Sequence, residues 1–213
     1  MKNPWLDISL ADYEGHMALP QVAQARLLSD VFACALGQYS PESVAVLGCA
    51  GGNGFERIDS ETIERVVGVD LNPDYIRQAR ARFERKFRVL ELFTSDVETD
   101  ECVFAPVDLV FVGLLFEYVD TGVVLTRIRS LLRENGILVT MVQLPHAAIP
   151  EVTPSPYASL GALSSVMHLV PPELLKQLAA ERGFQEIDTQ TVSSVGRKQF
   201  RVQTFRFLKF SFP

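Results

Sequence analysis

Short apolar runs recur through the middle of the chain, and segments of helical character separate them. Five runs read as strands, at residues 44–47, 66–69, 88–93, 107–112 and 137–142. Strands that alternate with helices are joined by parallel crossovers, and helices then cover both faces of the sheet. The pattern therefore predicts an α/β fold with a doubly wound, mostly parallel sheet and helices on both faces.

Two of the predicted helices have recognisable ends. Asn72 can cap a helix that starts at Pro73 and continues through YIRQARARF, because Asn is favoured at the N-cap and Pro at the first helical position. The fourth crossover, residues 123–136, carries an apolar stripe and reaches Asn135-Gly136, a pair that suits a left-handed cap. We expect both segments to be helical, and we expect a further helix between the first two strands.

The regular alternation stops after the fifth strand. Residues 145–170 contain several prolines and no clear periodicity, which is typical of binding loops, and they predict a substrate lid. Residues 171–213 predict a helix that opens at Pro171-Pro172, followed by an antiparallel hairpin that turns at residues 196–198. With a last strand over 199–210, the hairpin completes a sheet of seven strands.

The N-terminal residues 1–40 divide into two parts. Residues 5–20 read as an irregular lid segment with many side chains that can contact a ligand, and residues 21–36 read as an amphipathic helix. Residues 41–144 form the predicted sheet core. We find no internal repeat and therefore expect a single domain over 1–213.

Composition narrows the class of protein. The chain has 213 residues, and its hydrophobic fraction of 47% supports a folded globule with a substantial core. No apolar run approaches the roughly 20 residues that span a bilayer, and the N-terminus lacks a signal-type apolar core. We therefore expect a soluble, cytoplasmic protein.

The charge balance bears on possible partners. The net charge is −6, whereas nucleic-acid binding depends on clustered Lys and Arg side chains that neutralise phosphates. The basic cluster over residues 77–88 has helical spacing and reads most simply as the solvated face of one helix. Nucleic acid is therefore an unexpected partner.

The cysteines indicate a reducing compartment and no metal site. Cys34, Cys49 and Cys102 are odd in number, widely separated and without C-x-x-C spacing, so they predict neither a disulfide framework nor a zinc site. Cys49 lies inside a glycine-rich turn, where its small side chain is expected to pack beneath the loop.

That turn belongs to the most informative segment of the chain, residues 44–72. An apolar run leads into GCAGGNG at residues 48–54, and the next apolar run ends on Asp70. A strand, a tight turn where backbone approaches a ligand, and a carboxylate at the end of the next strand are what a nucleotide-type cofactor requires. A cofactor-dependent enzyme is therefore the leading hypothesis.

From residue 44 to the C-terminus, these motifs resemble the class I S-adenosylmethionine-dependent methyltransferases. The resemblance makes 41–144 the cofactor-binding core, implies S-adenosylmethionine as the cofactor, and matches Asp70 to the acid that binds the ribose hydroxyls. The cofactor-binding positions that it implies are Gly48, Cys49, Ala50, Gly52, Asn53, Asp70, Leu71, Asn72, Asp96, Val97, Gly113 and Leu114. Among them, Asp96 and Val97 match the adenine contacts.

The chain departs from the family pattern at two positions. Ala50 stands at the middle glycine of the first motif, and Val46 stands where many members have an acid two residues before the first glycine. In the fourth motif, Asp108 is expected to serve the sheet, while Glu117 and Tyr118 are candidates that point toward a substrate. Serine and aspartate at 95–96 also read as a helix start, which leaves the role of Asp96 open.

Catalytic residues are harder to predict, because a sulfonium already makes its methyl group electrophilic. The protein then needs mainly to hold a nucleophile in line with the methyl group, and a general base is needed only when the acceptor must lose a proton. The candidates near the site are His16, His146 and Tyr13, with His168 and Tyr157 as weaker alternatives.

The acceptor is expected to be a small molecule, since the chain offers one compact insertion and no basic surface, and a protein side chain stays open as an alternative. Aromatic and apolar residues in both lids indicate a partly apolar acceptor. Two other functions stay open at this point. One is a noncatalytic protein that binds S-adenosylmethionine or S-adenosylhomocysteine. The other is a nicotinamide-dependent oxidoreductase, which the glycine spacing and the hairpin disfavour. The hairpin or the lid could also form the contact of a homodimer.

Overall fold

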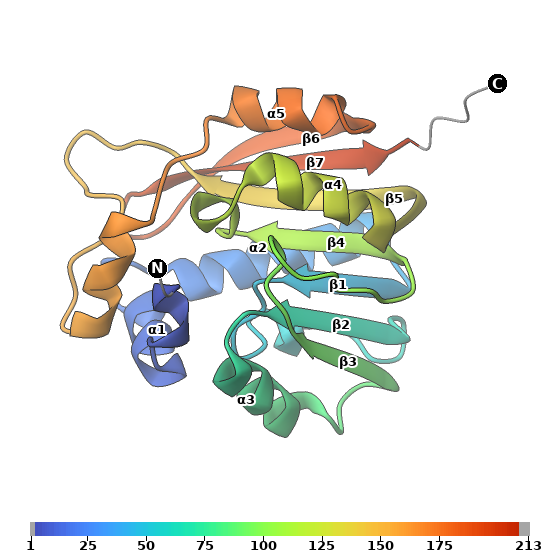
Figure 1. Cartoon of the computed structure of the whole chain (residues 1–213), viewed down its shortest axis with the longest axis horizontal. Coiled ribbons are helices and arrows are strands. Elements are labelled where there is room, and N and C mark those ends of the chain that lie inside the picture. Colours follow the sequence, from blue (N-terminus) through green and yellow to red (C-terminus); the bar gives the residue numbers. More distant parts are fainter. Residues whose placement is uncertain (1–2, 209–213) are drawn as a thin grey trace.

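The computed structural model describes residues 3–208 and contains one seven-stranded sheet in the order β3-β2-β1-β4-β5-β7-β6 (Figure 1). The strands from β1 to β5 pair in parallel, and β7 is antiparallel to both β5 and β6. The predicted fold class is confirmed. The strands are β1 Ser43–Leu47, β2 Arg65–Asp70, β3 Val89–Thr94, β4 Val107–Gly113, β5 Leu132–Gln143, β6 Phe184–Ser193 and β7 Gln199–Phe207.

The order of the strands reverses between β1 and β4. The chain runs outward from β1 to β3 and then returns to β4 on the other side of β1. Leu47 at the end of β1 pairs with Val69 of β2 and Val112 of β4, so the loops after these strands meet at one edge. Open α/β sheets bind ligands at such a switch point, outside the carboxyl ends of the strands.

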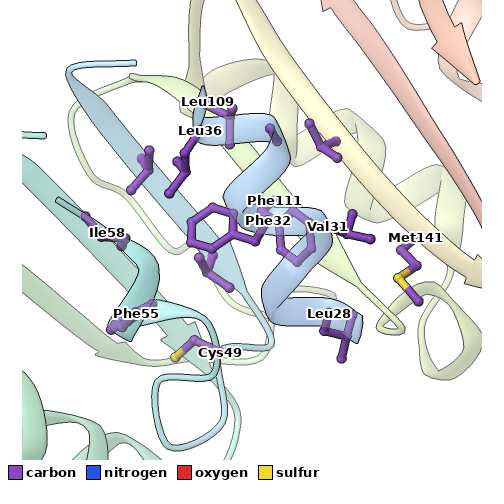
Figure 2. Close-up of a cluster of buried hydrophobic side chains, with 14 of the residues drawn as sticks. Leu28, Val31, Phe32, Leu36, Cys49, Phe55, Ile58, Leu109, Phe111 and Met141 are labelled. Atoms are coloured by element: carbon purple, nitrogen blue, oxygen red, sulfur yellow. The ribbon is translucent and has the colours of Figure 1, made fainter. Parts of the chain in front are cut away.

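Helices cover both faces of the sheet, and each face has its own core. The helices are α1 Leu10–Ala18, α2 Gln24–Tyr39, α3 Pro73–Phe83, α4 Thr121–Leu131 and α5 Pro172–Ala180. On one face, Phe32 of α2 packs against Phe111 of β4 (Figure 2), and α3, which carries the buried Ile76, lies against β2 and β3. On the other face, α4 and α5 pack through Ile128 and Leu175. Two buried faces explain why the central strands are continuously apolar rather than alternating.

The prediction of an irregular segment over residues 5–20 is wrong, because α1 occupies most of it. The Ser9 side chain caps this helix by accepting a hydrogen bond from the Asp12 N–H at 3.1 Å. Gly15 lies inside the helix, where glycine lowers helix propensity and so obscures the pattern. A Cβ at this position would lie 2.3 Å from the Tyr157 hydroxyl, so the glycine allows residues 145–170 to approach α1 closely.

The expected helix between β1 and β2 is also absent from the described chain. Only the short 3-10 helix Phe55–Arg57 forms there, because Gly52 and Gly54 both adopt positive φ angles, of 90° and 87°, that a helix does not allow. Residues 95–106, between β3 and β4, contain no helix either, so the helix start read at 95–96 does not form.

The fourth crossover ends earlier than predicted. The helix α4 stops at Leu131, and Leu132 already pairs with Val107 in the sheet. Asn135 is left-handed as expected, with φ of 63°, but it lies at the start of β5 instead of capping the helix.

The C-terminal prediction is confirmed for the described residues. The helix α5 opens at Pro172, and the hairpin turns where Ser194 N–H donates to the Lys198 carbonyl. In residues 145–170 the lid contains the 3-10 helix Ala158–Ser165. The predicted segments 1–40 and 171–213, and the predicted strand 199–210, extend to residues that lie outside the described range.

Residues 3–208 contain neither a membrane-spanning helix nor a cluster of metal-binding side chains. No helix in this range is long and apolar enough to cross a membrane. The same residues contain no group of three or more His, Cys, Asp and Glu side chains that could hold a metal ion. All three cysteines are free, and Cys49 is buried.

Candidate functional site

A cavity of about 80 Å³ lies at the carboxyl edge where β1, β2 and β4 end, and we call it the switch-point cavity. Its wall combines the glycine-rich turn, the end of β2, the loop after β3 and the loop after β4. It is lined by Trp5, Tyr13, Gly48, Ala50, Asp70, Leu71, Tyr75, Ser95, Val97, Gly113, Leu114, Leu115 and Tyr118. Seven of the twelve predicted cofactor-binding residues are in that set.

Asp70 is the only carboxylate in the described wall of this cavity. Its Oδ2 accepts a hydrogen bond from the Ala50 N–H at 2.8 Å, and its Oδ1 accepts one from the Asn72 N–H at 2.9 Å. Burial raises the pKa of Asp70 to about 6, against the lowering effect of these two hydrogen bonds. Each oxygen retains a lone pair, so the carboxylate can still accept hydrogen bonds from a vicinal diol.

Two non-glycine residues in the wall of the switch-point cavity adopt left-handed backbone angles. Ala50 has φ of 47° and Leu114 has φ of 56°, in a region that side chains make unfavourable. Such strained residues cluster at ligand sites. Leu114 is held there by its N–H, which donates to the Met141 carbonyl of β5 at 2.9 Å.

Five of the predicted cofactor-binding residues lie elsewhere. Cys49 packs under the turn in the core, and Gly52 and Asn53 line another cavity of about 290 Å³, which residues of α1 also line. The Asn72 side chain caps α3 and also donates to the Trp5 carbonyl at 2.9 Å. The Asp96 carboxylate accepts from the Glu98 N–H at 2.8 Å in its own turn.

The N-terminal segment forms a cover over the switch-point cavity. The Trp5 ring meets the Tyr13 and Tyr118 rings edge to face, with centroids 5.8 Å and 5.0 Å apart. Tyr13 stacks on Tyr75, and burial raises the pKa of both tyrosines. Glu14 pairs with Arg82 of α3. These contacts fix α1 across the carboxyl edge of the sheet.

A second, smaller cavity of about 50 Å³ shares four wall residues with the first, and we call it the lid cavity. The shared residues are Trp5, Tyr13, Leu114 and Tyr118. The remaining wall is assembled from distant segments and consists of His16, Gln24, Glu117, Gln143, Glu151, Val152, Thr153, Leu160, Leu163, Met167 and Lys198.

Glu117 is fully buried in the wall of the lid cavity. Its Oε1 accepts a hydrogen bond from the Gln143 N–H at 2.6 Å, whereas Oε2 has no hydrogen-bond partner among residues 3–208. Burial raises the pKa of Glu117 to about 7, so this carboxyl group changes its protonation state near neutral pH.

His16 and Lys198 are the basic groups of the same cavity. His16 is 8% exposed, its Nδ1 has no hydrogen-bond partner in the described chain, and burial and the charge of Lys198 lower its pKa. Lys198 is 2% exposed and donates to the Gln143 side-chain oxygen at 3.2 Å and to the Glu151 carbonyl. Burial lowers the pKa of Lys198 to about 8.

The predicted catalytic candidates are therefore separated. Tyr13 lines both cavities and His16 lines the lid cavity. His146 is exposed and accepts a hydrogen bond from the Ala148 N–H, and neither cavity includes it. Tyr157 lies against Gly15 of α1, and His168 lines a shallow groove between α4 and α5.

Sequence reasoning missed Lys198 and Gln143. Lys198 reads as an ordinary turn residue, and Gln143 as the polar end of a strand, so no local signal identifies them. Val46, where the family usually has an acid, is buried in the core of the sheet.

Comparisons with known proteins agree with the geometry. Residues 44–136 match a family model described as a methyltransferase domain. No curated protein matches the chain in sequence. The matched segment contains the glycine-rich turn, Asp70 and the end of β4, but not α1, the lid or Lys198.

Solved structures share the fold over most of the chain. The N-methyltransferase NodS from Bradyrhizobium japonicum, in complex with S-adenosylhomocysteine, is 17% identical, with 86% of this chain and 87% of that chain covered and a TM-score of 0.63. The 1,6-didemethyltoxoflavin-N1-methyltransferase from Burkholderia thailandensis, with bound 1,6-didemethyltoxoflavin and S-adenosylhomocysteine, is 19% identical, with 93% of this chain and 84% of that chain covered and a TM-score of 0.66.

The same fold also occurs in a protein named for another reaction. The [4+2]-cyclase SpnF is 14% identical, with 87% of this chain and 82% of that chain covered and a TM-score of 0.66. In all, 1155 chains of solved structures match. The fold by itself therefore identifies neither the reaction nor the molecule that reacts.

Proposed function

We propose that this chain, which carries a methyltransferase domain on the class I S-adenosylmethionine-dependent methyltransferase fold, binds S-adenosylmethionine and transfers its methyl group to a small-molecule acceptor. The observation that carries the proposal is the meeting of the glycine-rich turn, the Asp70 carboxylate and the apolar Leu71 and Val97 in one cavity at the switch point. A small acceptor is further supported by the net charge of −6, which disfavours nucleic acid.

The residues of the switch-point cavity fit this cofactor chemically. Asp70 would hold the ribose hydroxyls, Leu71 and Val97 would flank the adenine, and the backbone from Gly48 to Ala50 would approach the methionine portion. Asp96 stays a proposed partner of the adenine amino group, and it would have to exchange the Glu98 N–H for that role.

The present volume implies that the cover moves. The 80 Å³ of the switch-point cavity is below the roughly 300 to 1,000 Å³ of small-molecule sites. Tyr13 and Ala50 also line the 290 Å³ cavity beside Gly52 and Asn53. A shift of α1 would join the two spaces and would bring Gly52 and Asn53 into the cofactor site, as the family resemblance implies.

The cofactor, when bound, supplies an electrophilic methyl group on a sulfonium. The chain's own contribution is to hold the acceptor in line, to exclude water, and to accept a proton where the acceptor must lose one. Tyr13 and His16 stand on the acceptor side and are the proposed participants. His146 would reach an acceptor only after a movement of the lid.

A noncatalytic S-adenosylmethionine-binding protein is the second candidate. Ala50 in a left-handed conformation and Val46 in place of an acid both depart from the family pattern. The fold also occurs in SpnF, which is named as a cyclase. Binding without methyl transfer to any acceptor would favour this alternative.

Calorimetric titration with S-adenosylmethionine, S-adenosylhomocysteine and NAD tests the cofactor directly. We expect both adenosyl ligands to bind and NAD not to bind; a preference for NAD would overturn the proposal. A metabolite panel then tests methyl transfer by release of S-adenosylhomocysteine. His16→Ala should slow transfer at least tenfold if His16 acts on the acceptor, with His146→Ala as the comparison variant.

A further inference from the structure

We propose that the lid cavity is the acceptor site, and that it selects a small molecule carrying both a carboxylate, which Lys198 binds, and an O–H or N–H nucleophile, which donates its hydrogen bond and then its proton to Glu117. This inference rests on the proposed function, because methyl transfer defines what an acceptor is. It adds the chemical class of the acceptor and the residues that recognise its two ends.

The position of the lid cavity supports an acceptor role. It meets the switch-point cavity at Trp5, Tyr13, Leu114 and Tyr118. Leu114 directly follows β4, at the carboxyl edge where sheets of this type place their ligands. A molecule in the lid cavity would therefore face a molecule in the switch-point cavity across this shared wall. At about 50 Å³ the lid cavity is also smaller than an ordinary small-molecule site, so the movement of the cover must widen it as well.

Glu117 provides the end that receives a proton. The 3-10 helix Phe116–Tyr118 places it next to the shared residue Tyr118. Its Oε1 is fixed by the Gln143 N–H, and its fully buried Oε2 has no partner among residues 3–208. A buried oxygen without a partner costs free energy, and a ligand that donates to it would remove that cost. The raised pKa of about 7 suits a group that takes a proton near neutral pH.

Lys198 provides the end that binds an anion. An ammonium group has three donors, and only two acceptors meet it, the Gln143 side-chain oxygen and the Glu151 carbonyl. No carboxylate among residues 3–208 lies within ion-pair distance of Nζ. Buried charges are normally paired, so a carboxylate ligand would complete this site.

Gln143 fixes the separation of the two ends. Its backbone N–H donates a hydrogen bond to Glu117, and its side-chain oxygen accepts one from Lys198. Both groups are therefore positioned by the same residue, at the end of β5. His16, whose lowered pKa keeps the imidazole neutral, lies near Lys198 and offers a further polar atom through its unpaired Nδ1.

The transfer balances with these groups. The nucleophile's lone pair forms the new bond to the methyl carbon, and the electron pair of the broken carbon–sulfur bond stays on sulfur, which becomes a neutral thioether. The O–H or N–H proton passes to Glu117 Oε2, while its bonding electrons stay on the nucleophile. No further oxidant, reductant or metal is needed.

Matched probes test the carboxylate end without any turnover. Glycolate and 3-hydroxybenzoate are compared with glycolamide and 3-hydroxybenzamide by ligand-observed NMR titration of the protein loaded with S-adenosylhomocysteine. We expect at least one acid to bind about tenfold or more tightly than its amide, and Lys198→Gln to abolish the difference. The exposed Lys176→Gln is the control and should retain it.

The same acids test the proton-accepting end. Methoxyacetate and 3-methoxybenzoate lack the O–H, so they should bind at least about fivefold more weakly than the hydroxy acids. Glu117→Gln should reduce that ratio, whereas the exposed Glu61→Gln should not. Any hydroxy acid that is methylated should be converted at least about 100-fold more slowly by Glu117→Gln, a loss well beyond the roughly fivefold loss of affinity expected from the missing hydrogen bond.

Several results would overturn the inference: equal binding of acids and amides, a preference that survives Lys198→Gln, or no binding by either acid. If a variant fails to fold, the comparison of acid with amide in the unaltered protein still decides. Calorimetry with S-adenosylhomocysteine on the same preparation separates the two proposals. Loss of that binding contradicts the proposed function, whereas binding without an acid preference contradicts only the acceptor class.

Discussion

The switch-point cavity and the lid cavity share a wall but hold their ionisable groups differently. In the first, both oxygens of Asp70 accept hydrogen bonds from backbone N–H groups of the adjoining loops. In the second, one oxygen of Glu117 and one nitrogen of His16 have no partner within residues 3–208. Lys198 is buried there and forms no ion pair within the same residues, although the charge of Glu151 acts on it.

This difference distinguishes a carboxylate that the backbone already holds from ionisable groups that a ligand must complete. The contrast concerns these charged groups, since the buried Tyr75 hydroxyl in the wall of the switch-point cavity also has no partner among residues 3–208. The two backbone donors are the Ala50 N–H in the turn after β1 and the Asn72 N–H after β2, so both come from loops at the switch point of the sheet. Unpaired buried groups each cost about 1 to 3 kcal/mol. The unpartnered groups of the lid cavity therefore lower the stability of the fold, and in our proposal a bound acceptor offsets this cost. Each prediction below tests one side of this contrast.

The largest effect on ligand affinity is expected in the switch-point cavity. Asp70→Ala should weaken S-adenosylmethionine binding by about 1 to 3 kcal/mol, roughly 5- to 150-fold, because the ribose hydroxyls lose a charged acceptor. Calorimetry measures the change. Asp74→Ala, an exposed acid on α3, is the matched control. Equal affinity in the two variants would remove Asp70 from the cofactor site.

The burial of Lys198 in the lid cavity should make the free energy of unfolding depend on pH. Burial lowers its pKa from 10.5 to about 8, so between these values the unfolded chain binds a proton that the folded chain does not. The stability of the unaltered protein relative to Lys198→Met should therefore rise with pH, by at most about 1.4 kcal/mol per pH unit.

Urea unfolding between pH 7 and pH 10 measures this slope. Lys176 gives a control of opposite sign, because its hydrogen bond to Glu186 raises its pKa. A flat difference between the unaltered protein and Lys198→Met would mean that the ammonium is already compensated in the folded state.

Cofactor affinity should fall in mild acid. The pKa of Asp70 is raised to about 6, and only its ionised form accepts two hydrogen bonds from the ribose. At pH 5 about one molecule in ten is ionised, so affinity should be about tenfold lower than at pH 7. Asp70→Asn is the control variant, since Glu117 and His16 also titrate nearby. If its cofactor affinity still fell steeply between pH 7 and pH 5, the fall would belong to Glu117 or His16 and not to Asp70.

The smallest effect is expected for Ala50→Gly. Glycine relieves the left-handed strain at φ of 47°, worth about 1 kcal/mol, but it removes a buried methyl group worth a similar amount. Stability should change by less than about 0.5 kcal/mol and cofactor affinity by less than about twofold. A tenfold gain in affinity would show that the departure from the family motif had impaired binding.

The sequence predicted the sheet well because two buried faces leave a strong local signature. Continuous apolar runs and the turn at Asn72-Pro73 depend on neighbours within a few residues, and the structure confirms both. Elements whose formation depends on distant contacts were missed. The helix α1 contains Gly15, which weakens its local signal, and it is held by Tyr157 and Arg82 from other parts of the chain. Asn72 holds the segment that precedes this helix.

The sequence by itself determined the fold class, the glycine-rich turn and Asp70, because these depend on periodicity and on residues joined by one short connection. Only the tertiary structure brought Glu117, Lys198 and His16 together, because they come from the loop after β4, the hairpin turn and α1. Their burial and missing partners are properties of the packed molecule, since both depend on which distant segments exclude water from a side chain.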